Sequence, residues 1–296
     1  MTLEQLRIFV AVAEREHVTR AAEALNLTQS ATSAAVAALE SRYRTKLFSR
    51  VGRGIELTEA GRLFLSEARA VLARASDAET MLADLAGLRR GMVRLAASQT
   101  VANYWLPSRM AHFHRAYPDI ALPLTIGNTE QVSRWIGDGQ ADLGLIEGTI
   151  EEPSLSVEKV ANDRLVLVVG KDHPWALRPP STWSDVTRTR WVLREPGSGT
   201  RGMFEAALSE NGIASAGLDI SLELPSNEAV IAAVISGAGA TAVSELAAVS
   251  ALRSRLAVVV PFELPMRSFS LVRHRERHLG SGPRAFLDAL KKSGTP

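Results

Sequence analysis

Residues 19–39, TRAAEALNLTQSATSAAVAAL, carry the pattern of two short helices joined by a tight turn. Thr19 is a residue type that caps helix starts, and Asn26 can adopt the left-handed conformation that ends the first helix. The second helix then begins at Thr28. Its buried side is predicted from the residues that recur at i, i+4 and i+7, namely Thr32, Val36 and Leu39. The pattern therefore predicts a helix pair whose second helix has one exposed face.

The exposed face of that second helix carries residue types that bind DNA. Gln, Ser and Thr at the start of a helix can bond base edges and phosphates when the helix enters a major groove. The candidate DNA-contacting residues are Thr28, Gln29, Ser30 and Ser33. An ordinary helical hairpin is the alternative, because this stretch alone fits both interpretations.

A short hairpin is predicted directly after the helix pair. In LFSRVGRGIELT, residues 47–58, two strand-like pieces flank a glycine-containing turn with Arg53 at its tip. A hairpin in this place forms a wing, with Arg53 able to reach a minor groove and Arg50 nearer the phosphates. The surrounding run from Ser41 to Ile55 contains five basic residues and no acid, which favours a phosphate backbone as partner. A solvated helix end followed by a loop is the alternative.

A long helix is predicted from Thr58, its cap, to about Leu88, a span of about 46 Å. Apolar residues form a stripe along it: Phe64, Leu65, Ala68, Val71, Leu72, Ala75, Ala78, Leu82 and Leu85. The same helix of a second subunit is the expected partner, because a homodimer also presents two reading heads to two half-sites. Packing against its own domain is the alternative.

Composition sets the broad class of the protein. The 296 residues suggest about two domains, and 46% hydrophobic with 22% charged residues is typical of a globular protein. The first 91 residues hold 13 Lys and Arg against 11 Asp and Glu, which is the whole excess of 34 over 32. The chain has no cysteine, so zinc–thiolate sites and disulfides are excluded. Early charges interrupt the N-terminus, and no apolar run reaches membrane-spanning length, so a cytoplasmic protein without membrane contact is expected.

From Met92 onward, short β-branched runs alternate with helical segments. This alternation predicts parallel sheets with crossover helices, and the number of strands predicts two α/β lobes. In such sheets, ligands bind beyond the carboxyl ends of the strands, where helix N-termini present free N–H groups.

Three strand-to-helix turns are rich in hydroxyl and amide side chains and together predict a pocket for a small anion. The candidate effector-binding residues are Ser98, Gln99 and Thr100 in the first turn, Asn128 and Thr129 in the second, and Ser198, Gly199, Thr200 and Arg201 in the third. Arg201 can add positive charge or pair with an acid such as Glu195. Each turn can instead be a helix cap.

The third turn also contains a match to G-x-G-x-x-G at Gly197–Gly202, with Asp219 or Glu223 about 20 residues further on. This match alone predicts an NAD-dependent enzyme, but it leaves the first 91 residues unexplained. Other catalytic motifs are absent from the sequence, and the six histidines are scattered. The sequence thus predicts no catalytic residue, no metal site and no cofactor.

The chain resembles the LysR-type family of bacterial transcriptional regulators. The resemblance rests on LRIFVAVAE, on TRAAEALNLTQSATSAAVAALE and on LFSR-x-GR-x-IELTEAG, in this order. It implies a winged helix-turn-helix, a long linker helix and a two-lobed α/β effector domain of the periplasmic-binding-protein type. It also implies homodimers that form homotetramers, an operator of double-stranded DNA, an effector bound between the lobes, and possible contact with the transcription machinery. The implied domains are 1–58 for DNA binding, 59–91 for the linker, and 92–296 for the effector domain, with lobe 1 at 92–161 plus 266–296 and lobe 2 at 162–265.

The resemblance assigns base reading to Gln29, Ser30 and Ser33, and the sequence departs from the family there. Many relatives have proline at the place of Ser30 and a long polar side chain at the place of Ala34. DNA deformability is therefore expected to share in recognition. The segments EPGSGTR and IGNTE resemble the branch that answers to sulfur-assimilation anions or to metabolites of carbon fixation. A solute-binding protein with the same lobes is a further alternative, which the N-terminal 91 residues disfavour.

Overall fold

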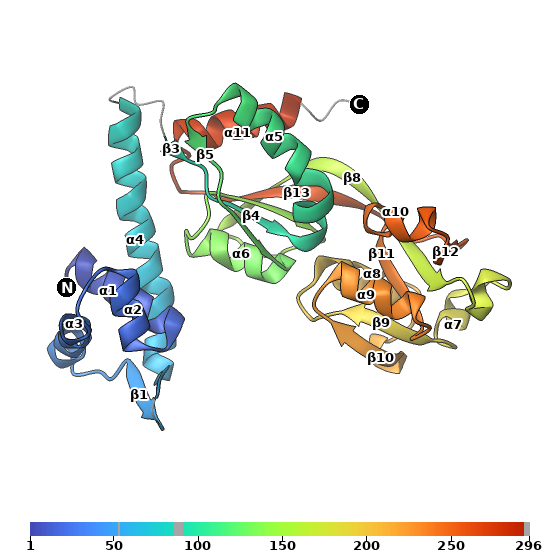
Figure 1. Cartoon of the computed structure of the whole chain (residues 1–296), viewed down its shortest axis with the longest axis horizontal. Coiled ribbons are helices and arrows are strands. Elements are labelled where there is room, and N and C mark those ends of the chain that lie inside the picture. Colours follow the sequence, from blue (N-terminus) through green and yellow to red (C-terminus); the bar gives the residue numbers. More distant parts are fainter. Residues whose placement is uncertain (53, 86–90, 293–296) are drawn as a thin grey trace. The chain divides into compact units, whose positions relative to one another are not determined.

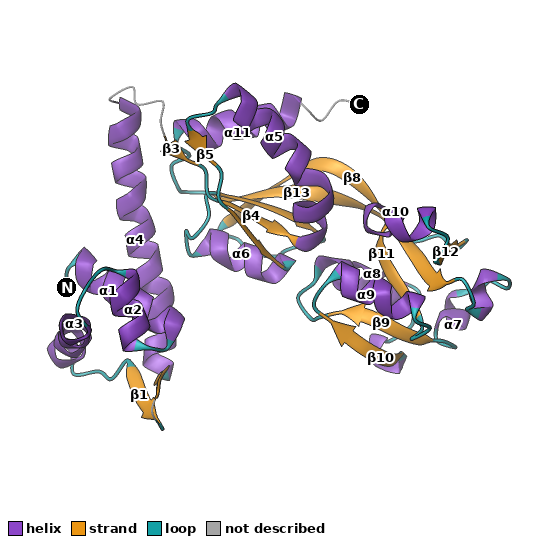
Figure 2. Ribbon diagram, in the orientation of Figure 1, coloured by secondary structure: helices purple, strands orange, loops and turns teal. Residues whose placement is uncertain are grey.

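The computed structural model describes residues 1–52, 54–85 and 91–292 (Figure 1). The chain divides into two compact units, of which one contains the N-terminal helices and the other the α/β part. Figure 2 shows the helical character of the first unit and the sheets of the second. No helix in the described part of the chain has the length and apolar character needed to cross a membrane.

The first unit begins with α1 (Leu3–Arg15), α2 (Val18–Ala24) and α3 (Gln29–Tyr43). The predicted turn between α2 and α3 is confirmed, because Asn26 has a φ of 56° and Thr28 Oγ1 accepts a hydrogen bond from Ala31 N at 3.2 Å. The predicted cap at Thr19 is wrong. α2 begins one residue earlier, and the ring Nδ1 of His17 accepts from Arg20 N at 3.4 Å.

The core of this unit packs α3 against α1. Thr32 and Leu39 are buried as predicted, and the half-buried Val36 packs against the apolar cluster of α1 and α2. Glu40 is also buried near the end of α3. Its carboxylate accepts hydrogen bonds from Leu47 N at 2.8 Å and Phe48 N at 3.1 Å, and so ties the following strand to α3.

The predicted hairpin forms from β1 (Phe48–Val51) and β2 (Gly54–Leu57), which pair antiparallel. Its predicted tip residue, Arg53, lies outside the described residues. Helix α4 (Glu59–Leu85) follows, and Thr58 Oγ1 accepts from Gly61 N at 3.0 Å, as a cap does. The predicted end near Leu88 also falls outside the described residues.

The apolar stripe of α4 has two parts. Ala68 is buried, and Phe64, Leu65 and Leu72 pack with it against the core of the same unit. Other large apolar side chains of α4 are exposed to solvent in the single chain, namely Val71 (42%) beside the packed part and Met81 (49%) and Leu82 (68%) further along. Packing within the domain therefore accounts for the first part of the stripe only.

The second unit contains two lobes. In lobe 1, β4 (Leu95–Ser98) pairs in parallel with β6 (Leu124–Gly127) and β7 (Leu143–Glu147). Its helices are α5 (Leu106–Ala116), α6 (Thr129–Gly137) and α11 (Ser281–Lys292). A π-helical turn, η1 (Val101–Trp105), precedes α5, and a small parallel pair joins β3 (Gly91–Met92) to β5 (Ile120–Ala121).

In lobe 2, β9 (Arg190–Arg194) pairs in parallel with β10 (Asp219–Leu224) and β11 (Ala240–Ser244). Its helices include α7 (Trp183–Val186), α8 (Gly199–Glu210), α9 (Asn227–Ile235) and α10 (Glu245–Arg253). Short 3-10 turns lie at η2 (Pro174–Ala176) and η3 (Ser215–Gly217). Trp191 and Phe204 lie at the centre of its core.

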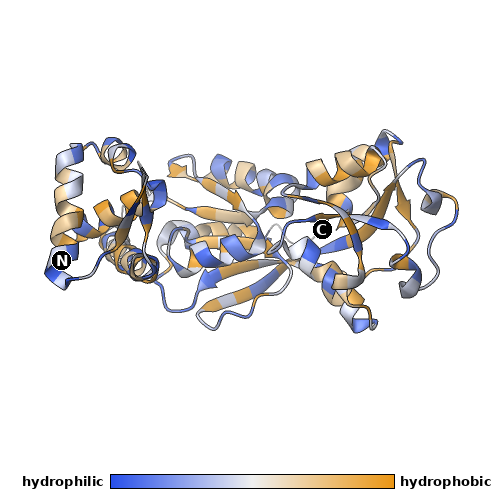
Figure 3. Cartoon of the chain, turned by 90° about the horizontal axis from the view of Figure 1, so that it is seen from below, coloured by the Kyte–Doolittle hydropathy of each residue, from blue (hydrophilic) through white to orange (hydrophobic). Residues whose placement is uncertain are grey.

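One long strand, β8 (Leu155–Gly170), runs through both lobes, and β13 (Met266–His274) pairs with its first part. β8 and β13 pair antiparallel, β13 also pairs antiparallel with β7, and β8 continues to pair with β11 and β12 (Ala257–Val260). The expectation of parallel sheets is thus wrong for these strands, because the chain crosses between lobes on extended segments. Figure 3 shows hydrophobic residues concentrated in the strands of the α/β unit.

Candidate functional site

The first candidate surface is the start of α3. Thr28, Gln29 and Ser30 are exposed on its first turn, with Thr28 Oγ1 and Ser30 Oγ 3.1 Å apart, and Ser33 is half-buried one turn later. The structure therefore brings these four predicted residues together on one helix. Arg50 is exposed on β1, and Arg53 lies outside the described residues. The arrangement offers hydroxyl and amide groups together with a nearby cation, which suits a nucleic-acid backbone and base edges.

The second candidate site lies where the strands of lobe 1 end, opposite the N-terminus of α8 in lobe 2. The hydroxyl residues predicted from the three turns are all buried here: Ser98, Thr100, Thr129, Ser198 and Thr200. The first two turns come together because β4, β6 and β7 are parallel neighbours, so their carboxyl ends share one edge of the sheet, whereas the third turn follows β9 of lobe 2.

A carboxylate that the sequence analysis missed lies among these hydroxyls. Glu147, the last residue of β7, is 1% exposed. Ser98 Oγ donates a hydrogen bond to Glu147 Oε2, and Thr200 Oγ1 donates to Glu147 Oε1 at 3.4 Å. The hydroxyl of Thr129 donates to the Glu147 carbonyl at 2.7 Å. The available signal was its position at the carboxyl end of a parallel strand, next to two turns already assigned to the site.

A buried guanidinium on β13 was also missed. The side chain of Arg267 is 0% exposed, its Nε donates to Asp163 Oδ2 at 2.5 Å, and its Nη1 donates to Thr200 Oγ1 at 3.0 Å. Ser244 Oγ donates to the other oxygen of Asp163 at 2.8 Å. No local pattern marks Arg267, because its segment has the composition of a core strand. Its charge is neutralised by Asp163, but it still carries hydrogen-bond donors toward the site.

Two buried donors of the site have no hydrogen-bond partner among the described residues. These are Arg267 Nη2 and Ser198 Oγ. Ser198 precedes α8 but makes no side-chain cap, and Thr100 makes none for η1. Asn128, in contrast, caps α6, since its Oδ1 accepts from Gln131 N at 2.9 Å. Helix capping therefore explains the second turn but leaves the first and third without that role.

A second set of contacts between the lobes lies after β4, where residues of lobe 1 form hydrogen bonds with the start of α9 in lobe 2. Gln99 Oε1 accepts from Asn227 N at 2.7 Å, and Asn227 Nδ2 donates to Thr100 Oγ1 at 3.1 Å. Tyr104 Oη donates to Glu228 Oε1 at 2.6 Å. Burial and this hydrogen bond raise the pKa of Tyr104. Burial raises the pKa of Glu228, but the hydrogen bonds from Tyr104, Asn103 and the backbone, together with the charge of Arg194, outweigh burial and lower that pKa overall. These bonds hold lobe 1 against lobe 2.

Arg201 is not paired with Glu195, which was one of the two roles that the sequence allowed for it. Its Nε donates to Glu205 at 2.7 Å, and its Nη1 donates to Glu223 and to the Arg194 carbonyl. Burial lowers the pKa of Arg201, and the two carboxylates outweigh this effect and raise it. Glu195 instead pairs with Arg194 at 2.8 Å. The positive charge of Arg201 is therefore already balanced by acids of its own lobe.

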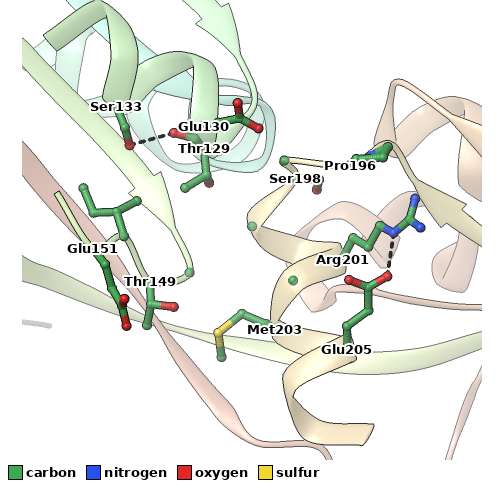
Figure 4. Close-up of a pocket in the computed structure, with 15 residues that line it drawn as sticks. Thr129, Glu130, Ser133, Thr149, Glu151, Pro196, Ser198, Arg201, Met203 and Glu205 are labelled. Atoms are coloured by element: carbon green, nitrogen blue, oxygen red, sulfur yellow. Dashed lines mark hydrogen bonds and ion pairs between the residues drawn. The ribbon is translucent and has the colours of Figure 1, made fainter. Parts of the chain in front are cut away.

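A pocket of about 490 Å³ opens beside the cluster, between α6 and α8 (Figure 4). Ser198, Thr129 and Met203 line it, together with the acidic side chains of Glu130, Glu151 and Glu205. Asn128 Nδ2 donates to Glu195 Oε1 and to the Pro196 carbonyl, both at 3.3 Å, and so joins the lobes at the pocket rim.

Two glycines of the G-x-G-x-x-G match, Gly197 and Gly199, lie at this contact between the lobes. Gly197 has a φ of 83°, and a Cβ at Gly199 would collide with the Glu147 carbonyl. A side chain at Gly199 would therefore force the lobes apart. The first two glycines of the apparent dinucleotide motif are thus explained by the contact between the lobes, whereas a Cβ at Gly202 would meet nothing within 4 Å.

Comparisons with known proteins match the whole length of the chain. Residues 3–62 match the family model described as "Bacterial regulatory helix-turn-helix protein, lysR family", and residues 86–295 match "LysR substrate binding domain". The "Uncharacterized HTH-type transcriptional regulator YeiE" of Escherichia coli K12 is 33% identical over 100% of this chain and 99% of that protein. The "RuBisCO operon transcriptional regulator" of Allochromatium vinosum is 34% identical over 97% and 95%. This last relative confirms the predicted likeness to regulators of carbon fixation.

Solved structures agree with this fold. A full-length OxyR variant from Pseudomonas aeruginosa gives a TM-score of 0.70 at 23% identity, covering 99% of this chain and 94% of that one. The CcmR regulatory domain from Synechocystis PCC6803, solved in complex with 2-PG, gives 0.64 at 25% identity, covering 70% and 98%.

Proposed function

Because the chain belongs to the LysR family of transcriptional regulators, and is thus a DNA-binding regulator and not an enzyme, we propose that α3 reads its operator. Thr28, Gln29, Ser30 and Ser33 enter the major groove, and Arg50 and Arg53 contact the backbone and the minor groove. The exposed hydroxyl and amide face of α3 supports this assignment. The protein acts on double-stranded DNA in the cytoplasm, where the transcription machinery is an additional candidate partner.

The chain pairs with a second copy through α4. The exposed apolar side chains of Val71, Met81 and Leu82 support a homodimer, because an apolar stripe on a long helix is stable only when it is covered. Two such dimers form a tetramer on a partly symmetrical operator. The domains are residues 1–58, 59–91 and 92–296, with lobe 1 at 92–161 plus 266–296 and lobe 2 at 162–265.

A small anion bound between the two lobes controls DNA binding. One observation carries this proposal: Arg267 Nη2 and Ser198 Oγ are buried donors without partners among the described residues, and they lie beside the hydroxyls of Ser98 and Thr200. Buried donors are normally satisfied, so a ligand with several acceptor oxygens completes this site. Thr100, Gln99, Asn128, Thr129, Gly199 and Arg201 form its surroundings. The CcmR regulatory domain, which is solved in complex with 2-PG, supports a small-molecule ligand for the α/β domain.

Calorimetric titration tests the effector proposal. The full chain is titrated with sulfate, sulfite, phosphorylated sugars and small carboxylates, and any ligand found is then added to an operator-binding assay. Thr100→Ala and Thr200→Ala are expected to abolish the response to the ligand while operator binding remains. Thr187→Ala, in a turn of lobe 2 where the hydroxyl donates to Ser184 O, is the matched control. A full response in both site variants would place the ligand elsewhere.

A further inference from the structure

The carboxylate of Glu147 occupies the centre of the proposed anion site. It accepts hydrogen bonds from Ser98 and from Thr200, two hydroxyls otherwise available to an anion. Ser198 belongs to the turn before α8, and the adjoining Gly199 lies against the Glu147 carbonyl. An anion that uses these hydroxyls must therefore bind beside a carboxylate that is almost completely buried.

Cations near the cluster do not offset the charge of Glu147. Arg267 is paired with Asp163, Arg194 with Glu195, and Arg201 with Glu205 and Glu223. Glu147 itself forms no ion pair with any residue that the structure describes. The adjoining pocket adds Glu151, together with Glu130 and Glu205, which are paired with Arg134 and Arg201. An unprotonated ligand oxygen placed against the Glu147 carboxylate would face it acceptor to acceptor, with no proton between them, and would be strongly repelled.

A proton on the ligand removes this conflict. If one oxygen of the ligand carries a hydrogen, that O–H donates to Glu147, and the charged oxygens point away from it. The remaining oxygens then accept from Arg267 Nη2 and Ser198 Oγ, the two donors that lack partners among the described residues. Each buried polar group of the cluster is satisfied in this arrangement, and it needs no further cation.

We propose that Glu147 selects an oxyanion that retains an O–H group, such as hydrogen phosphate, and rejects a fully deprotonated anion of the same shape, such as sulfate. This inference rests on the proposed anion-binding function of the cleft. Glu147 accepts the hydrogen bond from the ligand O–H, and the hydroxyls and the guanidinium bind the other oxygens. A site that pairs with a ligand hydroxyl discriminates strongly against an analogue without it, because the acceptor is then left unpaired.

The test titrates the full chain with inorganic phosphate and with sulfate at neutral pH, because the two ions match in shape and differ in the proton. The wild type is expected to bind phosphate at least about a hundredfold more tightly than sulfate. In Glu147→Gln the amide removes the negative charge and supplies a donor, so sulfate binding strengthens and the ratio falls below about threefold. Glu210→Gln, at the exposed end of α8, makes the same chemical change away from the site and keeps the wild-type ratio.

Two results would overturn the inference. Equal binding of both ions by the wild type, lost in Thr200→Ala, would keep the cleft as an anion site but deny Glu147 its selective role. Absence of binding of either ion would also overturn it, while a cleft-dependent response to another ligand would leave the proposed function standing. The wild-type ratio decides the question even if Glu147→Gln fails to fold. A further titration with glycerol phosphate at about pH 6, where a monoester still partly retains its proton, distinguishes an ester from the free ion.

Discussion

Asn227, at the start of α9 in lobe 2, donates a hydrogen bond from Nδ2 to Thr100 Oγ1 of lobe 1 at 3.1 Å. Both residues are 0% exposed, and Arg194 donates to the amide oxygen of Asn227 at 3.0 Å. A fully buried side-chain amide thus provides one of the hydrogen bonds that join the two lobes.

Replacement of this amide is expected to destabilise the effector domain. Asn227→Ala leaves the Arg194 guanidinium without one acceptor and the Thr100 hydroxyl without one donor, at a cost of about 2 kcal/mol. Chemical unfolding followed by tryptophan fluorescence measures the effect, since Trp191 and Trp175 lie in the core of lobe 2. Ser236→Ala, at the exposed end of α9, is the control. A wild-type unfolding midpoint in Asn227→Ala would contradict the importance of this bond.

Glu40 is expected to make the DNA-binding unit sensitive to acid. Burial raises its pKa, but hydrogen bonds from Lys46, Leu47 and Phe48 outweigh burial and hold the pKa below the ordinary 4.5. The carboxylate is therefore favoured in the folded state. Its stabilisation is complete above about pH 4.5, the unfolded value, and is lost as the pH falls through the lower folded value.

Glu40→Gln tests this prediction. The neutral amide loses charge-assisted bonds to two backbone amides, so the variant is expected to lose about 2 kcal/mol near pH 7 and to show a weaker dependence on acid. Circular dichroism of the full chain during denaturation at several pH values gives the loss of stability near pH 7 and the dependence of stability on acid. Glu23→Gln, on the exposed side of α2, should behave as the wild type. An unchanged acid profile would remove Glu40 from this role.

The hairpin arginines are expected to contribute to DNA affinity through phosphate contacts. Each of Arg50→Ala and Arg53→Ala should weaken operator and non-specific binding alike and lower the slope of log K against log salt by about 0.9. Fluorescence anisotropy at several salt concentrations measures this slope. Arg178→Ala, on the surface of lobe 2, should leave it unchanged. An unaltered slope in both hairpin variants would place the hairpin outside the DNA interface.

The exposed stripe of α4 is expected to hold the dimer together. Leu82→Glu places a charge among the apolar residues that a second copy would cover. The dissociation constant of the dimer is therefore expected to rise at least about tenfold. Analytical ultracentrifugation over a range of concentrations measures it. Leu177→Glu makes the same chemical change at a residue that is 89% exposed on lobe 2, and it should leave the dimer unchanged. A dimer of wild-type strength in Leu82→Glu would exclude this part of α4 from the interface.

Local patterns in the sequence account for much of the fold. The turn at Asn26 and the cap at Thr28 follow from neighbours within four residues, and so they are predicted correctly. Glu147 and Arg267 escaped prediction for the opposite reason. The bonds of Glu147 reach residues 49 and 53 positions away, and Arg267 reaches Thr200 across 67 positions. No periodicity within one segment carries such information.

Arg201 illustrates an intermediate case. One of the two acids that pair with it, Glu205, lies at i+4 on the same helix, and this spacing predicts an ion pair. The other, Glu223, comes from β10 and becomes a neighbour only through the sheet. Sequence reasoning therefore identified Arg201 as a charge near the cleft but could not count the acids that neutralise it.

The pairing of β8 with β13 has a mechanical consequence. Between the sheets of the two lobes, Asp163 faces Arg267 in a stretch where β13 has only β8 as its neighbour among the described strands. A ribbon of two strands twists and bends readily but resists stretching, so it acts as a hinge of fixed length. The guanidinium that faces the anion site is thus itself part of the hinge. We therefore expect a ligand that binds Arg267 to change the angle between the two lobes, because it contacts the two-stranded ribbon directly.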